Sequence, residues 1–207
     1  MTLHTSPLPA QTEQPPPSAP TRVVRAGGLA MAAGAAAWAA GTLAYDLDPV
    51  TDDFPWAYKL SSLVFQLGLV ALVAVQLRTR ATGPGRLARG FLHAEHVMLG
   101  LAIASSLQWL LAPDLSENLF FLALDLFWPL SMLGMAAIGV RIAIAGRWQG
   151  AARIWPLVAE SWAPVAIPAS FLLVGYAHYV GAAHLAIGYV MLGVILARRP
   201  ELTGARD

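Results

Sequence analysis

The 207-residue chain is 57% hydrophobic and 12% charged, with a formal net charge of +1. Its charged share is about half that of an ordinary soluble domain, which argues against a soluble globular protein. Cysteine is absent, which excludes disulfides, thiolate nucleophiles and cysteine-ligated zinc or iron–sulfur centres. The near-neutral charge and the scattered arginines predict no nucleic-acid partner.

Residues 1–21 form a separate compositional zone ahead of the apolar part of the chain. Prolines stand there among Ser, Thr and Gln, a mixture that cannot build a hydrophobic core. We therefore predict a disordered, proline-rich cytoplasmic tail at 1–21. A transmembrane domain is expected at 22–199 and a short cytoplasmic tail at 200–207.

Long apolar runs separated by short charged islands dominate the rest of the sequence. Each run has roughly the twenty residues needed to cross a hydrocarbon core. The runs are continuous rather than alternating, which favours helices over a β-barrel. The expected fold is all-α, a polytopic helical membrane protein with six transmembrane helices, at about 26–45, 57–77, 91–112, 119–140, 154–174 and 179–197.

The first of these helices carries glycine at a regular spacing. Gly27, Gly34 and Gly41 recur every seven residues, which places small side chains on one helix face. We interpret this face as a site of close helix packing.

Basic residues predict the orientation of the six helices in the membrane. With six spans, all twelve arginines fall on one side and Lys59 falls on the other. The positive-inside rule then places both termini in the cytoplasm. The excess of arginine over lysine, together with abundant alanine and glycine, suggests a GC-rich bacterial genome, and hence a multi-pass protein of the bacterial inner membrane.

Two acidic residues lie inside otherwise apolar runs, each four residues ahead of a proline: Asp125 before Pro129, and Glu160 before Pro164. Proline lacks an N–H and displaces the carbonyl of residue i−4, so kinks are expected at 125–129 and 160–164. Acidic residues within a membrane are costly and usually functional. This coincidence makes the two kinks the best functional lead in the sequence.

Depth along the predicted helices suggests two acid–histidine pairs. At a rise of 1.5 Å per residue, Glu160 lies roughly 9 Å from the cytoplasmic edge, near the depth of His96. Asp125 and His184 lie at a similar depth from the other edge. Glu160, His96, Asp125 and His184 are therefore the candidate binding residues, with Glu160 and His96 expected in a polar pocket open to the cytoplasm. Neighbouring Glu95 is expected to reach the headgroups instead.

A metal site is a weaker candidate. His93 and His96 share a helix face at i, i+3, and Glu160 would add a third ligand for zinc or iron. The sequence identifies no cofactor.

Three classes of function remain open. The first is a protein that binds or conducts a proton, a cation or a small solute near kinked helices. The second is an intramembrane enzyme that uses carboxylate acid–base chemistry on a lipid or isoprenoid-like substrate. The third is a non-catalytic membrane subunit or regulator. The expected partners are the lipid bilayer, a small hydrophobic or ionic ligand, and another membrane subunit; whether the chain is an enzyme stays open.

Overall fold

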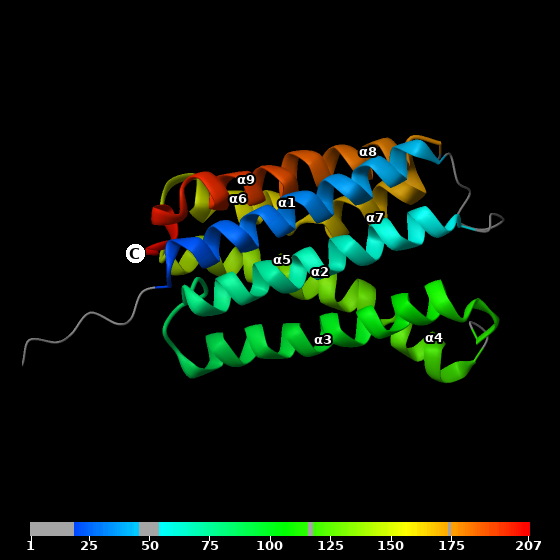
Figure 1. Ribbon diagram of the computed structural model, residues 1–207, viewed down its shortest axis with the longest axis horizontal. Coiled ribbons are helices and arrows are strands. Elements are labelled where there is room, and N and C mark those ends of the chain that lie inside the picture. The colour runs from blue at the N-terminus through cyan, green and yellow to red at the C-terminus, as the bar shows by residue number, and fades with distance from the viewer. Residues whose placement is uncertain (1–18, 46–53, 116–117, 174) are drawn as a thin grey trace, which may run out of the picture.

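A computed structural model describes residues 19–45, 54–115, 118–173 and 175–207. These residues are helical nearly throughout and contain no strand. The predicted tail at 1–21 lies mostly outside the described residues. The helices, which lie side by side along the long axis (Figure 1), are α1 (Thr21–Ala44), α2 (Trp56–Arg78), α3 (Arg86–Leu111), η1 (Pro113–Leu115), α4 (Leu119–Asp125), α5 (Phe127–Ala145), α6 (Gly150–Ala159), α7 (Trp162–Leu172), α8 (Ala177–His184), η2 (Leu185–Val190), α9 (Met191–Arg198) and η3 (Pro200–Thr203).

Five helical segments of the described chain are long and apolar enough to cross a membrane. They correspond to the predicted runs 1, 2, 3, 4 and 6, and are Thr21–Ala44, Trp56–Arg78, Arg86–Leu111, Leu119–Ala145 and Ala177–Arg198. The predicted run at 154–174 is divided into α6 and α7, neither of which is long enough by itself to count among these segments.

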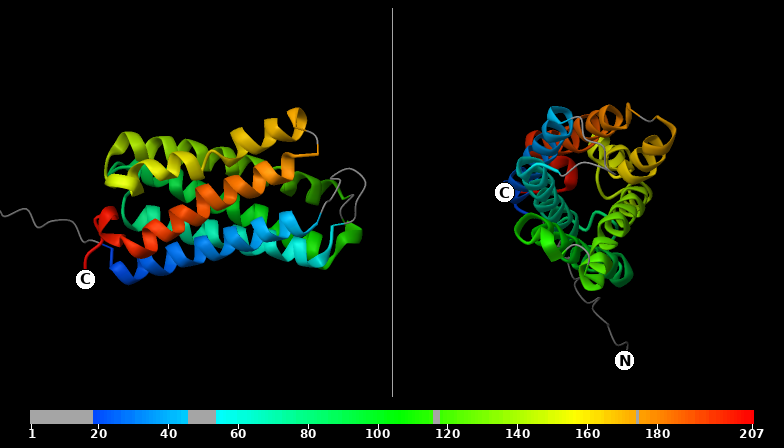
Figure 2. Two further views of the ribbon diagram at one scale, coloured as in Figure 1. Left: turned by 90° about the horizontal axis from the view of Figure 1, so that it is seen from above. Right: turned by 90° about the vertical axis from the view of Figure 1, so that its right-hand side faces the viewer.

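The helices close into a ring. α1 contacts α2, α2 contacts α3, α3 contacts α5, and α5 contacts both α6 and α7. The α8–η2–α9 segment packs against α6 and α7 on one side and against α1 on the other. The end-on view in Figure 2 shows the helices arranged around a common centre.

Both termini of the described chain lie at the same end of the ring. The Arg206 N–H donates to the Ala19 carbonyl at 3.1 Å, and the side chains of Thr21 and Asp207 are also hydrogen-bonded. We call this end the terminal end and the opposite end the loop end. Residues 200–207 pack onto the bundle, since Thr203 and Ala205 are buried.

Glycines permit the closest helix crossings. A Cβ atom at Gly34 would lie 2.8 Å from the Val64 carbonyl oxygen, and one at Gly41 would lie 2.5 Å from Ser61 Oγ. Gly27 likewise meets α2, at Val75, so the predicted packing face of Gly27, Gly34 and Gly41 is confirmed. A second crossing brings α1 against α9. There the backbones of Gly28 and Gly193 touch.

Candidate functional site

The interruption between α6 and α7 positions the central residue of the site. α6 ends at Ala159, Glu160 and Ser161 form a turn, and α7 begins at Trp162. Pro164 cannot donate an i→i−4 hydrogen bond to the Glu160 carbonyl, so continuous α-helix is disfavoured at this point. The chain is also interrupted at Leu126, between α4 and α5. Both predicted kinks are therefore confirmed.

Glu160 is completely buried against α2 and α5. Gln76 Nε2, on α2, donates a 2.5 Å hydrogen bond to Glu160 Oε1. The second carboxyl oxygen, Oε2, has no hydrogen-bond partner among the described residues. A Cβ atom at Gly139 of α5 would lie 3.0 Å from this oxygen and 2.7 Å from the Pro156 carbonyl. The absence of a side chain at Gly139 thus makes room for the Glu160 carboxyl.

Glu95, on α3, is the second buried acid. It is also fully buried, and neither of its carboxyl oxygens has a hydrogen-bond partner in the described part of the chain. A Cβ atom at Gly134 of α5 would collide with Glu95 Oε2. One helix, α5, therefore provides a glycine opposite each acid, Gly139 for Glu160 and Gly134 for Glu95.

Tyr189 is a further buried polar residue in this region. Its side chain is fully buried and its hydroxyl has no hydrogen-bond partner within the described ranges. The preceding residue, Gly188, packs against Ala159, which directly precedes Glu160. We call Gln76, Glu95, Glu160 and Tyr189 the carboxyl cluster. It combines groups from α2, α3, the α6–α7 turn and η2.

Tyr189 is positioned by a π-helical turn. η2 spans Leu185–Val190 and is such a turn, a rare element that is common at functional sites. The Trp155 indole of α6 donates to the carbonyls of Ile187 at 2.9 Å and Gly188 at 3.2 Å. Gly188 also allows close contact, since a Cβ atom there would lie 2.8 Å from Ala159 Cα. The wide turn is thus held against the α6–α7 interruption.

Replacing Trp155 with phenylalanine should destabilise this arrangement. The change keeps an aromatic ring but removes the only donor of the indole, and leaving carbonyl partners unpaired costs roughly 1–3 kcal/mol. We expect a lower thermal midpoint in detergent for Trp155→Phe, and no change for Trp56→Phe, whose side chain is 63% exposed. Equal midpoints for the two variants would show that the indole bond does not hold the π turn.

The predicted pairing of Glu160 with His96 is wrong. His96 Nδ1 lies 2.9 Å from the carbonyl of Leu92 on its own helix, and the partner of Glu160 is Gln76. Glu95, expected to reach the headgroups, occupies the interior instead. The reason is the rotation of α3 about its own axis. Glu95 lies on the buried face of α3 together with Leu92 and Leu99, whereas His96, the next residue, points away from that face.

The predicted pairing of Asp125 with His184 is also wrong. Asp125 Oδ1 accepts a hydrogen bond from Ser105 Oγ at 3.3 Å, whereas His184 Nε2 lies 3.2 Å from Ser161 Oγ. The two residues therefore have separate partners on different helices. Their similar depth did not bring them into contact.

The metal centre predicted from His93, His96 and Glu160 is not assembled. His93 is exposed and Glu160 is fully buried. In the described ranges no three His, Asp or Glu side chains gather in a way that could hold a metal ion.

Sequence reasoning missed three members of the carboxyl cluster. Leu92, Glu95, Leu99 and Ala102 recur at the spacing of one helix face, and this periodicity could have identified Glu95 as inward-facing. Gln76 is a polar residue inside an apolar run, and this could likewise have identified it as a candidate. No sequence pattern identified Tyr189, because a π turn shifts side chains out of the α-helical periodicity.

A second polar region lies at the loop end. An open cavity of about 200 Å³ is lined by side chains of α1, α2, α3, α4 and α5 together with Phe54. Asp125 and three serines supply its polar groups. Trp38 and Trp128 line it, and both contact Trp162, with ring centroids 5.3 Å apart in a tilted pair and 5.2 Å apart in an edge-to-face pair.

The fold and the carboxyl cluster define an all-helical protein with several membrane-length apolar helices and an acid pair buried at its centre. No protein-family model, curated protein or solved structure matches this chain.

Proposed function

We propose that the chain is a multi-pass membrane protein that binds and transfers protons at Glu95 and Glu160. The observation that carries this proposal is the burial of two carboxyl groups that face the same helix, α5, three of whose four oxygens have no hydrogen-bond partner among the described residues. Carboxylates without compensating partners are very costly in an apolar interior. Proton binding removes that cost, and acidic residues in proton relays of membrane proteins are used in this way.

The composition of the cluster favours a proton over a metal ion. Its other members, Gln76 and Tyr189, are neutral side chains that can donate and accept hydrogen bonds. Fewer than three His, Asp or Glu side chains meet in any one place within the described chain. A shared proton needs only two oxygens, whereas hard cations such as Ca²⁺ need six or more ligands.

The proposal places six spans in the membrane, with α6 and α7 together forming the fifth. Figure 2 shows α6 and α7 following one another along one side of the bundle. The meeting of Ala19 and Arg206 at one end supports an even number of crossings. A broken helix of this kind is where membrane transporters place ion sites.

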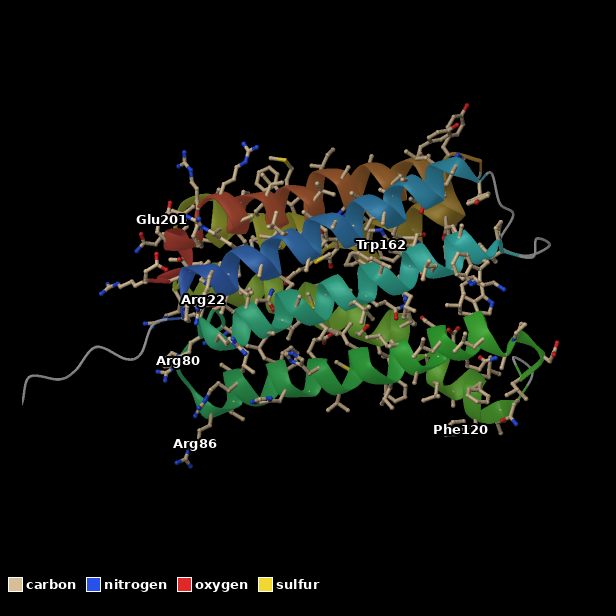
Figure 3. All side chains as sticks on the ribbon, in the orientation of Figure 1. Arg22, Arg80, Arg86, Phe120, Trp162 and Glu201 are labelled. Atoms are coloured by element: carbon tan, nitrogen blue, oxygen red, sulfur yellow. The ribbon has the colours of Figure 1, made fainter. Side chains whose placement is uncertain are left out.

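Charge supports a cytoplasmic terminal end. Arg22, Arg80 and Arg86 lie at that end of the bundle, whereas Phe120 lies at the other (Figure 3). By the positive-inside rule the terminal end then faces the cytoplasm of a bacterial inner membrane.

Reporter fusions in a bacterial host test this topology. We expect a green fluorescent protein fused after Asp207 to fluoresce, and alkaline phosphatase fused there to be inactive. Both results should be reproduced by fusions after Arg147, in the α5–α6 connection. An active phosphatase after Asp207 combined with a fluorescent fusion after Arg147 would mean that α6 and α7 do not cross.

Proton transfer itself is tested in liposomes. Purified protein reconstituted into vesicles with an entrapped pH-sensitive dye should dissipate an imposed pH gradient faster than protein-free vesicles. Valinomycin and potassium would be present to prevent a limiting membrane potential. Dissipation no faster than in protein-free vesicles would reject the proposed function.

A further inference from the structure

The cavity at the loop end has walls suited to a cation. Five aromatic side chains surround it: Trp38, Phe54, Tyr58, Trp109 and Trp128. The face of an aromatic ring is electronegative and attracts ammonium groups, most strongly for tryptophan. Cages of this composition recognise quaternary ammonium ligands.

The wall already attracts the protein's own ammonium group. Lys59 Nζ lies 4.8 Å from the centroid of the Trp109 ring. The contact shows that Trp109 is placed and oriented for cation–π interaction.

Asp125 supplies the matching charge. It is an exposed residue at the mouth of the cavity and the only charged one among the described side chains that line it. Ser105 Oγ donates a 3.3 Å hydrogen bond to one of its oxygens. α4 ends at Asp125, so the interruption before α5 places this carboxyl at the cavity wall beside Trp128. A carboxylate among aromatic rings selects a positive ligand over a neutral one of the same shape.

Hydroxyl groups complete the lining. Ser62, Ser105 and Ser106 face the cavity, and Ser106 Oγ accepts a 2.7 Å hydrogen bond from Gln66 Nε2. The volume of about 200 Å³ suits a small molecule with one polar tail group. We infer that this cavity binds a small organic ammonium ion that carries a hydroxyl group, held by the aromatic cage and Asp125. The inference does not depend on proton transfer at the carboxyl cluster.

Titration calorimetry on the detergent-purified full chain tests the site. The probe is choline, and the comparison ligand is dimethylbutanol, in which carbon replaces the charged nitrogen. We expect saturable binding of choline and at least tenfold weaker binding of the neutral isostere. Asp125→Asn and Trp109→Leu should each weaken choline binding at least tenfold, whereas Asp114→Asn, an exposed acid at the same end, should leave it unchanged.

The outcomes separate a cation site from a merely apolar cavity. Equal affinity for choline and dimethylbutanol, or unchanged choline affinity in Asp125→Asn, would overturn the inference. The absence of saturable choline binding to the folded wild-type chain would overturn it as well. Thermal melts of each variant show whether a lost affinity reflects an unfolded protein, and Trp128→Phe, which keeps a ring, provides a second variant that should bind with intermediate affinity.

Discussion

Glu160→Gln should reduce proton flux in reconstituted vesicles to the level of protein-free vesicles while leaving the protein folded. The glutamine carbonyl can still accept the hydrogen bond from Gln76 Nε2, so the shape of the site and this bond are retained. The titratable proton is lost. Because one partner is exchanged for a near-isostere, the change in stability should stay within about 1 kcal/mol.

Two further variants serve as a control and as a second test of this prediction. Glu201→Gln removes an exposed acid at the terminal end and should leave the flux unchanged. Glu95→Gln should lower the flux as Glu160→Gln does, because the proton is held by the pair. If Glu160→Gln conducts protons at the wild-type rate, the acid serves only to fix helix packing, and the proposed function fails.

Gly193→Ala should lower the stability of the bundle strongly for the addition of one methyl group. A Cβ atom at this position would lie 2.5 Å from the Gly28 carbonyl oxygen, 2.7 Å from Ala32 N and 2.8 Å from Ala32 Cβ. These are mostly backbone atoms, so relief requires α1 and α9 to separate. Overpacking of this kind costs roughly 1–3 kcal/mol, which corresponds to a fall of about 2–12 °C in thermal midpoint for a chain of this size.

Gly181→Ala is the matched control in the same candidate span. A Cβ atom there meets no atom within 4 Å, and alanine favours a helix interior over glycine by about 1 kcal/mol. Its thermal midpoint should stay the same or rise. A midpoint for Gly193→Ala as high as that of Gly181→Ala would show that the α1–α9 crossing is not closely packed in the folded protein.

The helical class and most helix positions follow from the sequence because they depend only on the length and the apolar character of each run. A run of about twenty apolar residues has few alternatives in lipid. The glycine spacing in α1 predicted its contact face with α2 for the same reason, since a seven-residue repeat specifies one face of a helix. The interruption at Glu160 could also be predicted, because a proline cannot donate a hydrogen bond to the carbonyl four residues before it.

The partners within the site could not be predicted, because depth along a helix leaves its rotation undetermined. His96 and Glu95 are adjacent in sequence and share a depth, yet only Glu95 faces the centre of the ring. The interruption at Glu160 also divides the expected fifth helix, which changes the directions of the side chains beyond it. Asp125 and His184 illustrate the same limit, since Asp125 is hydrogen-bonded to Ser105 of α3 and His184 to Ser161 in the α6–α7 turn.

Infrared difference spectroscopy of the membrane-reconstituted protein tests the central claim most directly, namely that the buried acid pair holds an exchangeable proton. We expect a carboxylic-acid carbonyl band at neutral pH that shifts when the protein is transferred to deuterium oxide and is lost in both Glu95→Gln and Glu160→Gln. Glu201→Gln should retain the band. A spectrum in which neither variant removes a protonated carboxyl band, or in which that band never shifts in deuterium oxide, would contradict the account.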